Sequence, residues 1–175
     1  MLIKNKRNAF AITGAIFSIF IIFNILQIRR DINQEQGIGF TRTSILNRMK
    51  DSYPTLPKKV IIYIESDTVY FGLPPTEHVL PFQSGFGQTL LVWYNAKGDL
   101  FPACFFDEQY LYAIESQGYK ECEGRGFGYF RKMDDLKKAI GENNIKAENV
   151  IAFSYISSKN SLVNVTEQVG ESISK

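Results

Sequence analysis

The chain has 175 residues, about the size of one domain. Hydrophobic residues make up 45% of it and charged residues 22%, a globular balance that excludes disordered, collagen-like and disulfide-dense chains. Residues 1–50 carry eight basic and two acidic side chains, a net charge of +6, whereas residues 51–175 carry twelve and sixteen, a net charge of −4. Because the larger part is mildly acidic, we expect no nucleic-acid partner.

Residues 9–28 form an uncharged apolar stretch behind a basic flank at residues 1–8. Twenty residues of helix measure about 30 Å, the thickness of the bilayer's hydrocarbon. A core helix of a globular protein is amphipathic, whereas this stretch is apolar all round. It is also longer than the apolar part of a signal peptide and has no small-residue cleavage site. The sequence therefore predicts one transmembrane helix and the lipid bilayer as a partner.

The charges beside this stretch bear on its orientation. Three basic residues and the start amine precede it and three basic residues follow it, namely Lys4, Lys6 and Arg7 against Arg29, Arg30 and Arg42. These counts favour a cytoplasmic N-terminus. We therefore expect a single-pass protein of the cell membrane whose residues 29–175 are extracytoplasmic.

Residues 29–57 are predicted to be a juxtamembrane linker. Residues 31–40 are polar with two glycines and indicate a connector, and residues 43–52 have Ile45, Leu46 and Met49 at helical spacing. This short amphipathic helix could lie on the lipid headgroups or pack against the domain. Pro54 and Pro57 then lead into a globular domain at residues 58–175.

Short β-branched and aromatic runs predict the strands of this domain. They are residues 60–64, 68–71, 89–94, 127–130, 150–156 and 162–165, the last two joined by a hairpin loop at residues 157–160. Asp107 is predicted to cap a helix that ends at Gly118, and Asp134 a second one that ends at Asn143 and Asn144. This order favours an α+β fold with a mixed β-sheet and its two main helices on one face.

Glu65 and Asp67 follow the first predicted strand, and alternate residues of a strand point to the same face. Such a pair could act as acid and base or hold a divalent cation, or it could simply be solvated where a strand enters a turn. His78 is the only histidine and no G-x-S-x-G motif is present, which argues against a serine hydrolase triad. Because the chain has one histidine and two cysteines, too few for a conventional metal site, we expect no metal site and no cofactor.

Cys104 and Cys122 could be bonded in an exported domain or could be free buried thiols. Two segments place an aromatic ring between glycines, SGFG around Phe86 and GRGFG around Phe127. Exposed rings there could stack on the flat face of a sugar. Alternatively, the glycines could form turns or bulges that bring both rings into the core.

Three segments, PTLPKKVIIYIESD, PFQSGFGQTLLVWY and QGYKECEGRGFGYF, follow the single apolar helix. Together they resemble the C-terminal region of bacterial polytopic membrane glycosyltransferases that use lipid-linked sugars, over residues 9–157. In that class the last membrane helix leads into a small extracytoplasmic α/β domain. The class's body of many spanning helices and its early acidic catalytic loop do not appear here. The resemblance therefore implies an accessory or partial portion, and no catalytic residue is carried over.

Two functions follow as hypotheses. In the favoured one, the chain is a membrane-anchored extracytoplasmic accessory or binding domain that is not catalytic by itself. It would contact a polytopic membrane protein, a glycan or a lipid-linked sugar through Glu65, Asp67, Phe86 and Phe127. In the other, it is a membrane-anchored hydrolase or transferase that uses the Glu65 and Asp67 carboxylates.

Overall fold

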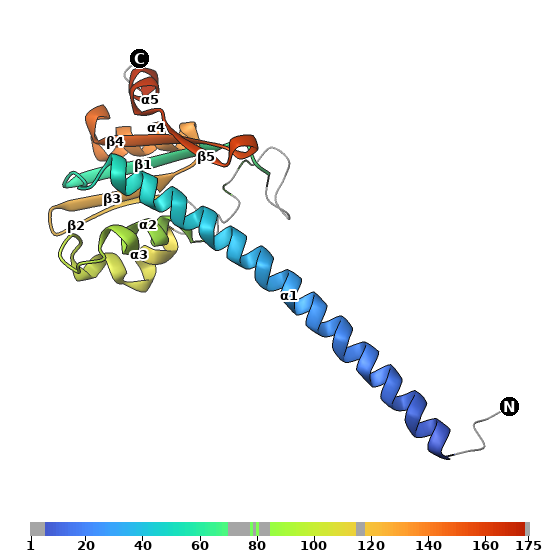
Figure 1. Ribbon diagram of the computed structural model, residues 1–175. Helices are drawn as coiled ribbons and strands as arrows, with labels where there is room; N and C mark the ends of the chain where they lie inside the picture. The colour runs from blue at the N-terminus through green and yellow to red at the C-terminus, as the bar shows by residue number, and fades with distance from the viewer. Residues whose placement is uncertain (1–5, 70–77, 79, 81–84, 115–117, 174–175) are drawn as a thin grey trace. The chain divides into compact units, whose positions relative to one another are not determined.

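The computed structural model describes residues 6–69, 78, 80, 85–114 and 118–173 (Figure 1). The chain divides into two units, Met1–Phe40 and Thr41–Lys175. The second unit starts well before residue 58, where the sequence predicted the globular domain to begin.

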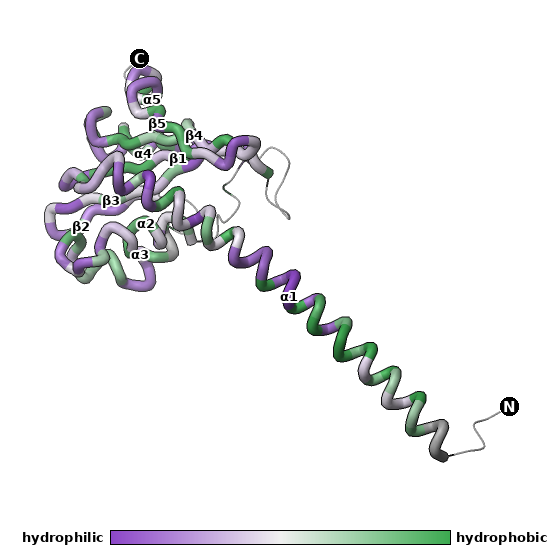
Figure 2. Tube along the Cα trace, viewed as in Figure 1, coloured by the Kyte–Doolittle hydropathy of each residue, from purple (hydrophilic) through white to green (hydrophobic). Residues whose placement is uncertain are grey.

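Helix α1 extends over Lys6–Ser52. Within the described residues it is the one helix that is long and apolar enough to cross a membrane, which agrees with the single candidate span expected from the sequence. Its apolar stretch stands out in the hydropathy colouring (Figure 2). Residues 31–40, the predicted connector, are helical as well, since extending a helix costs less free energy than starting a new one.

The last turns of α1, inside the second unit, belong to its hydrophobic core. Ile45, Leu46 and Met49 are 2%, 3% and 0% exposed. Just after the helix, the Tyr53 ring packs edge-on against Phe153, with the ring centroids 5.9 Å apart. Of the two alternatives for the predicted amphipathic helix, the structure therefore shows packing against the domain.

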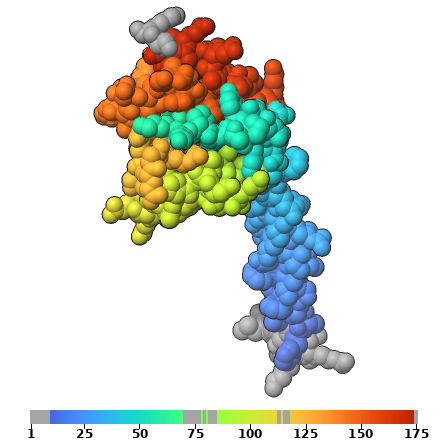
Figure 3. All heavy atoms as spheres, turned by 90° about the vertical axis from the view of Figure 1, so that its left-hand side faces the viewer, coloured from blue at the N-terminus to red at the C-terminus, as the bar shows by residue number. Residues whose placement is uncertain are grey.

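The second unit is built on a five-stranded mixed sheet in the order β2-β3-β1-β4-β5, which confirms the predicted mixed sheet. The three central strands are parallel: β1 (Lys59–Ser66), β3 (Arg125–Phe130) and β4 (Val150–Ile156). The edge strands β2 (Gly118–Cys122) and β5 (Ser161–Asn164) are antiparallel to their neighbours. In the space-filling view the chain around β1 lies between the C-terminal elements and the part that contains α2 and α3 (Figure 3).

Helices cover both faces of this sheet, so the prediction that they lie on one face was wrong (Figure 1). On the first face, Phe86 of α2 (Phe86–Tyr94) packs on Tyr129, Tyr110 of α3 (Glu108–Ala113) donates to the Phe127 carbonyl, and Tyr53 after α1 packs on Phe153. On the second face, α4 (Met133–Asn143) and α5 (Thr166–Ile173) cover Ile61 and Ala152. The physical reason is that central parallel strands are apolar on both sides and need cover on each.

Residues 89–94 belong to helix α2 and not to the predicted strand. Gly85 precedes the helix at φ +64°, a left-handed conformation that glycine adopts without strain. The buried residues Phe86, Leu90 and Tyr94 recur every four positions, which is a helical period. A short apolar run has the same composition in a buried strand and in a buried helix, so composition alone did not separate the two.

The other predicted elements are mostly confirmed. Asp107 caps α3 as expected, because its Oδ1 accepts the Gln109 backbone N–H at 2.8 Å, but α3 ends at Ala113 and the predicted end, Gly118, begins β2. Lys132, and not Asp134, precedes the first residue of α4, whereas Asn144 ends that helix in the left-handed region as predicted. In the predicted strand at residues 68–71, Val69 forms an isolated bridge with His78, and residues 70–71 lie outside the described part.

Candidate functional site

The structure has a pocket at the carboxyl ends of the three parallel strands, which we name the carboxyl-edge pocket. Its volume is about 430 Å³. It is lined by residues at the ends of β1, β3 and β4 together with one loop residue, namely Glu65, Ser66, Asp67, Arg131, Lys132, Ser154, Tyr155, Ile156 and His78.

The topology explains why a pocket forms there. β1 and β3 are neighbours, yet the helix that follows β1, α2, lies on the first face and the helix that follows β3, α4, lies on the second. In open α/β sheets, ligands bind in the crevice outside the carboxyl ends of strands where successive connections go to opposite faces. The carboxyl-edge pocket lies at this position.

Glu65 is an exposed carboxylate on the second face of the sheet, opposite Ser154 of β4 in the strand register. The Tyr63 hydroxyl donates to it at 3.5 Å, the outer limit of a hydrogen bond. Burial, with the nearby Glu65 charge as a smaller cause, raises the pKa of Tyr63 to about 12. The phenol is therefore a neutral donor beside Glu65 at physiological pH.

Asp67 is also exposed, but its carboxylate has a structural partner. Its Oδ1 accepts the backbone N–H of Ser157 at 2.8 Å, which joins the end of β1 to the turn after β4. This backbone hydrogen bond is the main reason why the pKa of Asp67 lies below its ordinary value of 3.8. Asp67 is therefore ionised at neutral pH.

Asp67→Asn is expected to lower the melting temperature at pH 7, and the difference should shrink as pH falls below 3.8, the ordinary value for an aspartate. A carboxylate with a lowered pKa stabilises the folded state above the pKa of the unfolded chain, and this stability is lost as pH falls through the folded-state value. Thermal unfolding of both proteins by circular dichroism, from pH 7 downward, measures the difference. A constant difference over this range would contradict the role given to the carboxylate.

The two predicted carboxylates thus line one pocket, but the arrangement does not favour an acid and base pair. A general acid at neutral pH needs a carboxyl group whose pKa is raised by burial. Both groups are exposed, and the pKa of Asp67 is lowered. The side chains that line the pocket are therefore suited to polar contacts with a ligand.

Phe86 and Phe127 do not join this pocket, and their prediction as exposed contact residues was wrong. Both rings are 0% exposed. Phe86 packs against Tyr129 on the first face of the sheet, and Phe127 packs against Phe101. Trp93 is half-buried. The glycines beside the two rings provide a turn and close packing, which is the alternative that the sequence left open.

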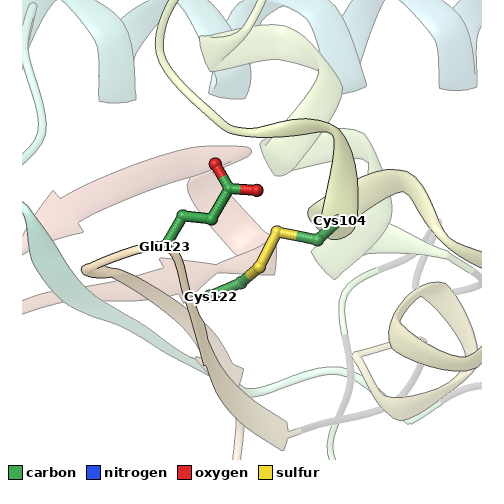
Figure 4. A group of neighbouring side chains, drawn as sticks. All are labelled: Cys104, Cys122 and Glu123. Carbon is green, nitrogen blue, oxygen red and sulfur yellow. A yellow bond between two sulfur atoms is a disulfide. The ribbon is translucent and has the colours of Figure 1, made fainter.

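Cys104 and Cys122 are joined in a disulfide, with their Cα atoms 6.5 Å apart. Figure 4 shows the bond with the Glu123 carboxylate beside it. The three side chains are close enough to hold a metal ion, with their ligand atoms within 4.8 Å of one another. However, thiolates and not disulfide sulfurs are metal ligands. With the disulfide formed, the Glu123 carboxylate is therefore the one ligand that these three side chains offer to a cation.

Replacing both cysteines by serine is expected to lower the free energy of unfolding by about 3 kcal/mol. The bond closes a loop across a sequence separation of 18, and the loss of such a cross-link frees chain entropy in the unfolded state. Denaturant unfolding with and without a reductant provides the measurement. The reductant should lower the free energy of unfolding of the wild type to that of the double variant, and it should leave the value of the double variant unchanged. Equal stability of all samples would contradict the prediction.

Sequence reasoning did not single out the basic side of the pocket, Arg131 and Lys132. The signal was present, because both follow directly on the predicted strand at residues 127–130. What was missing was the parallel pairing of β1 with β3, which places their carboxyl ends side by side.

We compared the chain with known protein families, with curated protein sequences and with solved structures, and none matched. The residues of the site therefore carry the functional inference that follows.

Proposed function

We propose that this chain is a single-pass membrane protein whose C-terminal domain lies outside the cytoplasm and binds a polar ligand as an accessory to a membrane glycosyltransferase. The helix α1 supplies the anchor. The sequence resemblance of residues 9–157 supports the association with such an enzyme. The ligand-binding site of the domain is the carboxyl-edge pocket.

The observation that carries the location is the disulfide. Disulfides persist in oxidising compartments and are rare in the cytosol. The chain has two cysteines, and they are bonded to each other. An extracytoplasmic location best explains a disulfide-bonded domain that follows a single membrane-spanning helix.

Binding is favoured over catalysis by the groups that line the carboxyl-edge pocket. Carboxylates, basic side chains and two serine hydroxyls line it, and such groups hydrogen-bond to the hydroxyls and charged groups of glycans and lipid headgroups. Because the Asp67 carboxylate is already held by Ser157, the chain by itself is not proposed to be a hydrolase or transferase.

Thiol labelling of the full chain in intact cells tests the location. A membrane-impermeant reductant followed by a polymer-linked maleimide should add two labels per chain, because Cys104 and Cys122 would be reached from outside. Without reductant, no label should be added, since both thiols are bonded.

Permeabilised cells provide the control for total labelling. If labelling required permeabilisation, and especially if it then occurred without reductant, the domain would be cytoplasmic and the proposed function would be wrong. Carbonate extraction of the same membranes tests the anchor separately: an integral protein stays in the pellet.

A further inference from the structure

We propose that two copies of this chain pair in the membrane along one side of α1, with Asn24 of each copy facing Asn24 of the other. This inference goes beyond the proposed function and rests on the membrane anchor that the proposed function includes. We name this side of the helix the Asn24 seam. It consists of Phe10, Thr13, Phe17, Phe20, Asn24 and Gln27.

The Asn24 seam has the spacing of a coiled coil. Its members recur alternately three and four positions apart, which is the seven-residue repeat that lets two helices stay in contact along their length. Most helices of membrane proteins cross at the angle found in such coiled coils. The seam therefore has the spacing that contact with a second, parallel helix requires.

The polar side chains of the apolar stretch gather on this side of α1. At about 100° per residue, Thr13, Asn24 and Gln27 lie within about 60° of one another around the helix. Ser18 is the one other polar residue between positions 10 and 28, and it lies on a different side. Contact with lipid tails is unfavourable for polar groups, so such groups in membrane helices usually face another helix.

The Asn24 amide is only partly satisfied by its own helix. Its Nδ2 donates to the backbone oxygen of Phe20 at 2.8 Å, and no described residue donates to its Oδ1. Gln27 differs, because its Nε2 donates to Asp31 at 3.1 Å. Asn24 lies about 6 Å inside the end of the apolar stretch, at 1.5 Å per residue. Its Oδ1 and second N–H therefore need partners at a depth where lipid tails offer none.

A second copy of the helix supplies these partners. A carboxamide both donates and accepts, and in a parallel pair with two-fold symmetry the same residue of each copy lies at the same depth. The second N–H of each Asn24 can then donate to the Oδ1 of the other. In coiled coils, one asparagine at this position of the repeat fixes the register and the number of helices.

Within the described part of the chain, no other element covers the seam. Phe17 and Phe20, on the two turns before Asn24, are each 63% exposed, and Asn24 itself is exposed. The rings of the seam are large, so they would pack against the rings of the second copy and exclude lipid around the paired amides.

Disulfide cross-linking of the full chain in its native membranes tests the pairing. Phe20→Cys places a thiol in the seam, and Ile22→Cys places one on the opposite side of α1 at a similar depth. After oxidation with copper phenanthroline, Phe20→Cys should give a covalent dimer on a non-reducing gel. Ile22→Cys should give about tenfold less, because the width of the helices keeps its sulfurs apart.

The chain without an added cysteine is the blank for this experiment, because Cys104 and Cys122 are bonded to each other. It should give no dimer. Equal yields of dimer from Phe20→Cys and Ile22→Cys would indicate random collision and would overturn the proposal. The absence of a dimer from Phe20→Cys would overturn it as well.

Two further variants, made in the Phe20→Cys chain, test the amide. Asn24→Leu should reduce the yield of dimer about tenfold, because it removes both reciprocal hydrogen bonds. Ser18→Leu is the matched control, since it also makes the apolar stretch more apolar but lies outside the seam. Its yield should be unchanged. Equal yields from Asn24→Leu and Ser18→Leu would overturn the assignment of the contact to Asn24.

The mass of the cross-linked product separates a second copy from another membrane protein. A product that contains a different chain in place of the dimer, identified by mass spectrometry, would overturn the second copy as the occupant. A chain that resists carbonate extraction and labels from outside but forms no dimer would overturn the pairing and leave the proposed function intact. Release of the chain by carbonate would instead overturn the anchor, and the pairing with it.

Discussion

A fragment of residues 41–175 is expected to fold and unfold cooperatively, whereas a fragment of residues 58–175 is expected to be unfolded. The boundary of the second unit lies at Thr41, and the segment lost in the shorter fragment carries Ile45, Leu46 and Met49. Removing one such buried side chain costs about 2–5 kcal/mol, so the loss of three is comparable with the whole stability of a typical domain. Circular dichroism melting curves of the two fragments measure the difference.

Point variants keep this prediction testable if the shorter fragment aggregates. Met49→Ala in residues 41–175 should lower the free energy of unfolding by about 2–5 kcal/mol, because the side chain is fully buried. Arg48→Ala, at an exposed position of the same turn, should change it by less than about 0.5 kcal/mol. A cooperative transition for residues 58–175 at an unchanged melting temperature would show that the end of α1 is not part of the core.

The strands that the sequence predicted best are those buried on both faces. Residues 60–64 are an unbroken run of β-branched and aromatic side chains, residues 150–156 are rich in them, and both segments form central parallel strands. The pattern of apolar residues in the sequence was weaker in elements that bury few side chains. α5 buries Val169 and exposes most of its other side chains, and the edge strand β2 is only half-buried, so neither element was predicted.

Part of the site could be predicted, because it depends on local order along one strand. Glu65 and Asp67 follow a buried strand, and both line the carboxyl-edge pocket. The rest depends on which strands are neighbours, and this information is not local. Without the pairing of β1 with β3, nothing connected Glu65 with Arg131, and nothing showed that Phe86 and Phe127 face the core.

Gly87→Ala is expected to cost about 3 kcal/mol or more of stability, the upper end of the range for overpacking a core. Gly87 is the second glycine of the SGFG segment and lies buried in the first turn of α2. A Cβ atom there would overlap the backbone carbonyl oxygen of Ile114 and lie 3.2 Å from the Tyr129 ring. Because the nearer atom is backbone, the overlap cannot be relieved by a change of rotamer, and α2 and the segment that directly follows α3 would have to move apart.

Gly141→Ala is the matched control for this substitution. Gly141 lies in α4, and a Cβ atom there meets nothing within 4 Å. Alanine should therefore stabilise that helix by about 0.5–1 kcal/mol, the usual difference between the two residues in a helix. Opposite signs in the two variants, measured by denaturant unfolding, would show that the glycine at position 87 permits close packing of α2. A neutral Gly87→Ala would instead mean that α2 lies farther from Ile114, and the core position of Phe86 would then need revision.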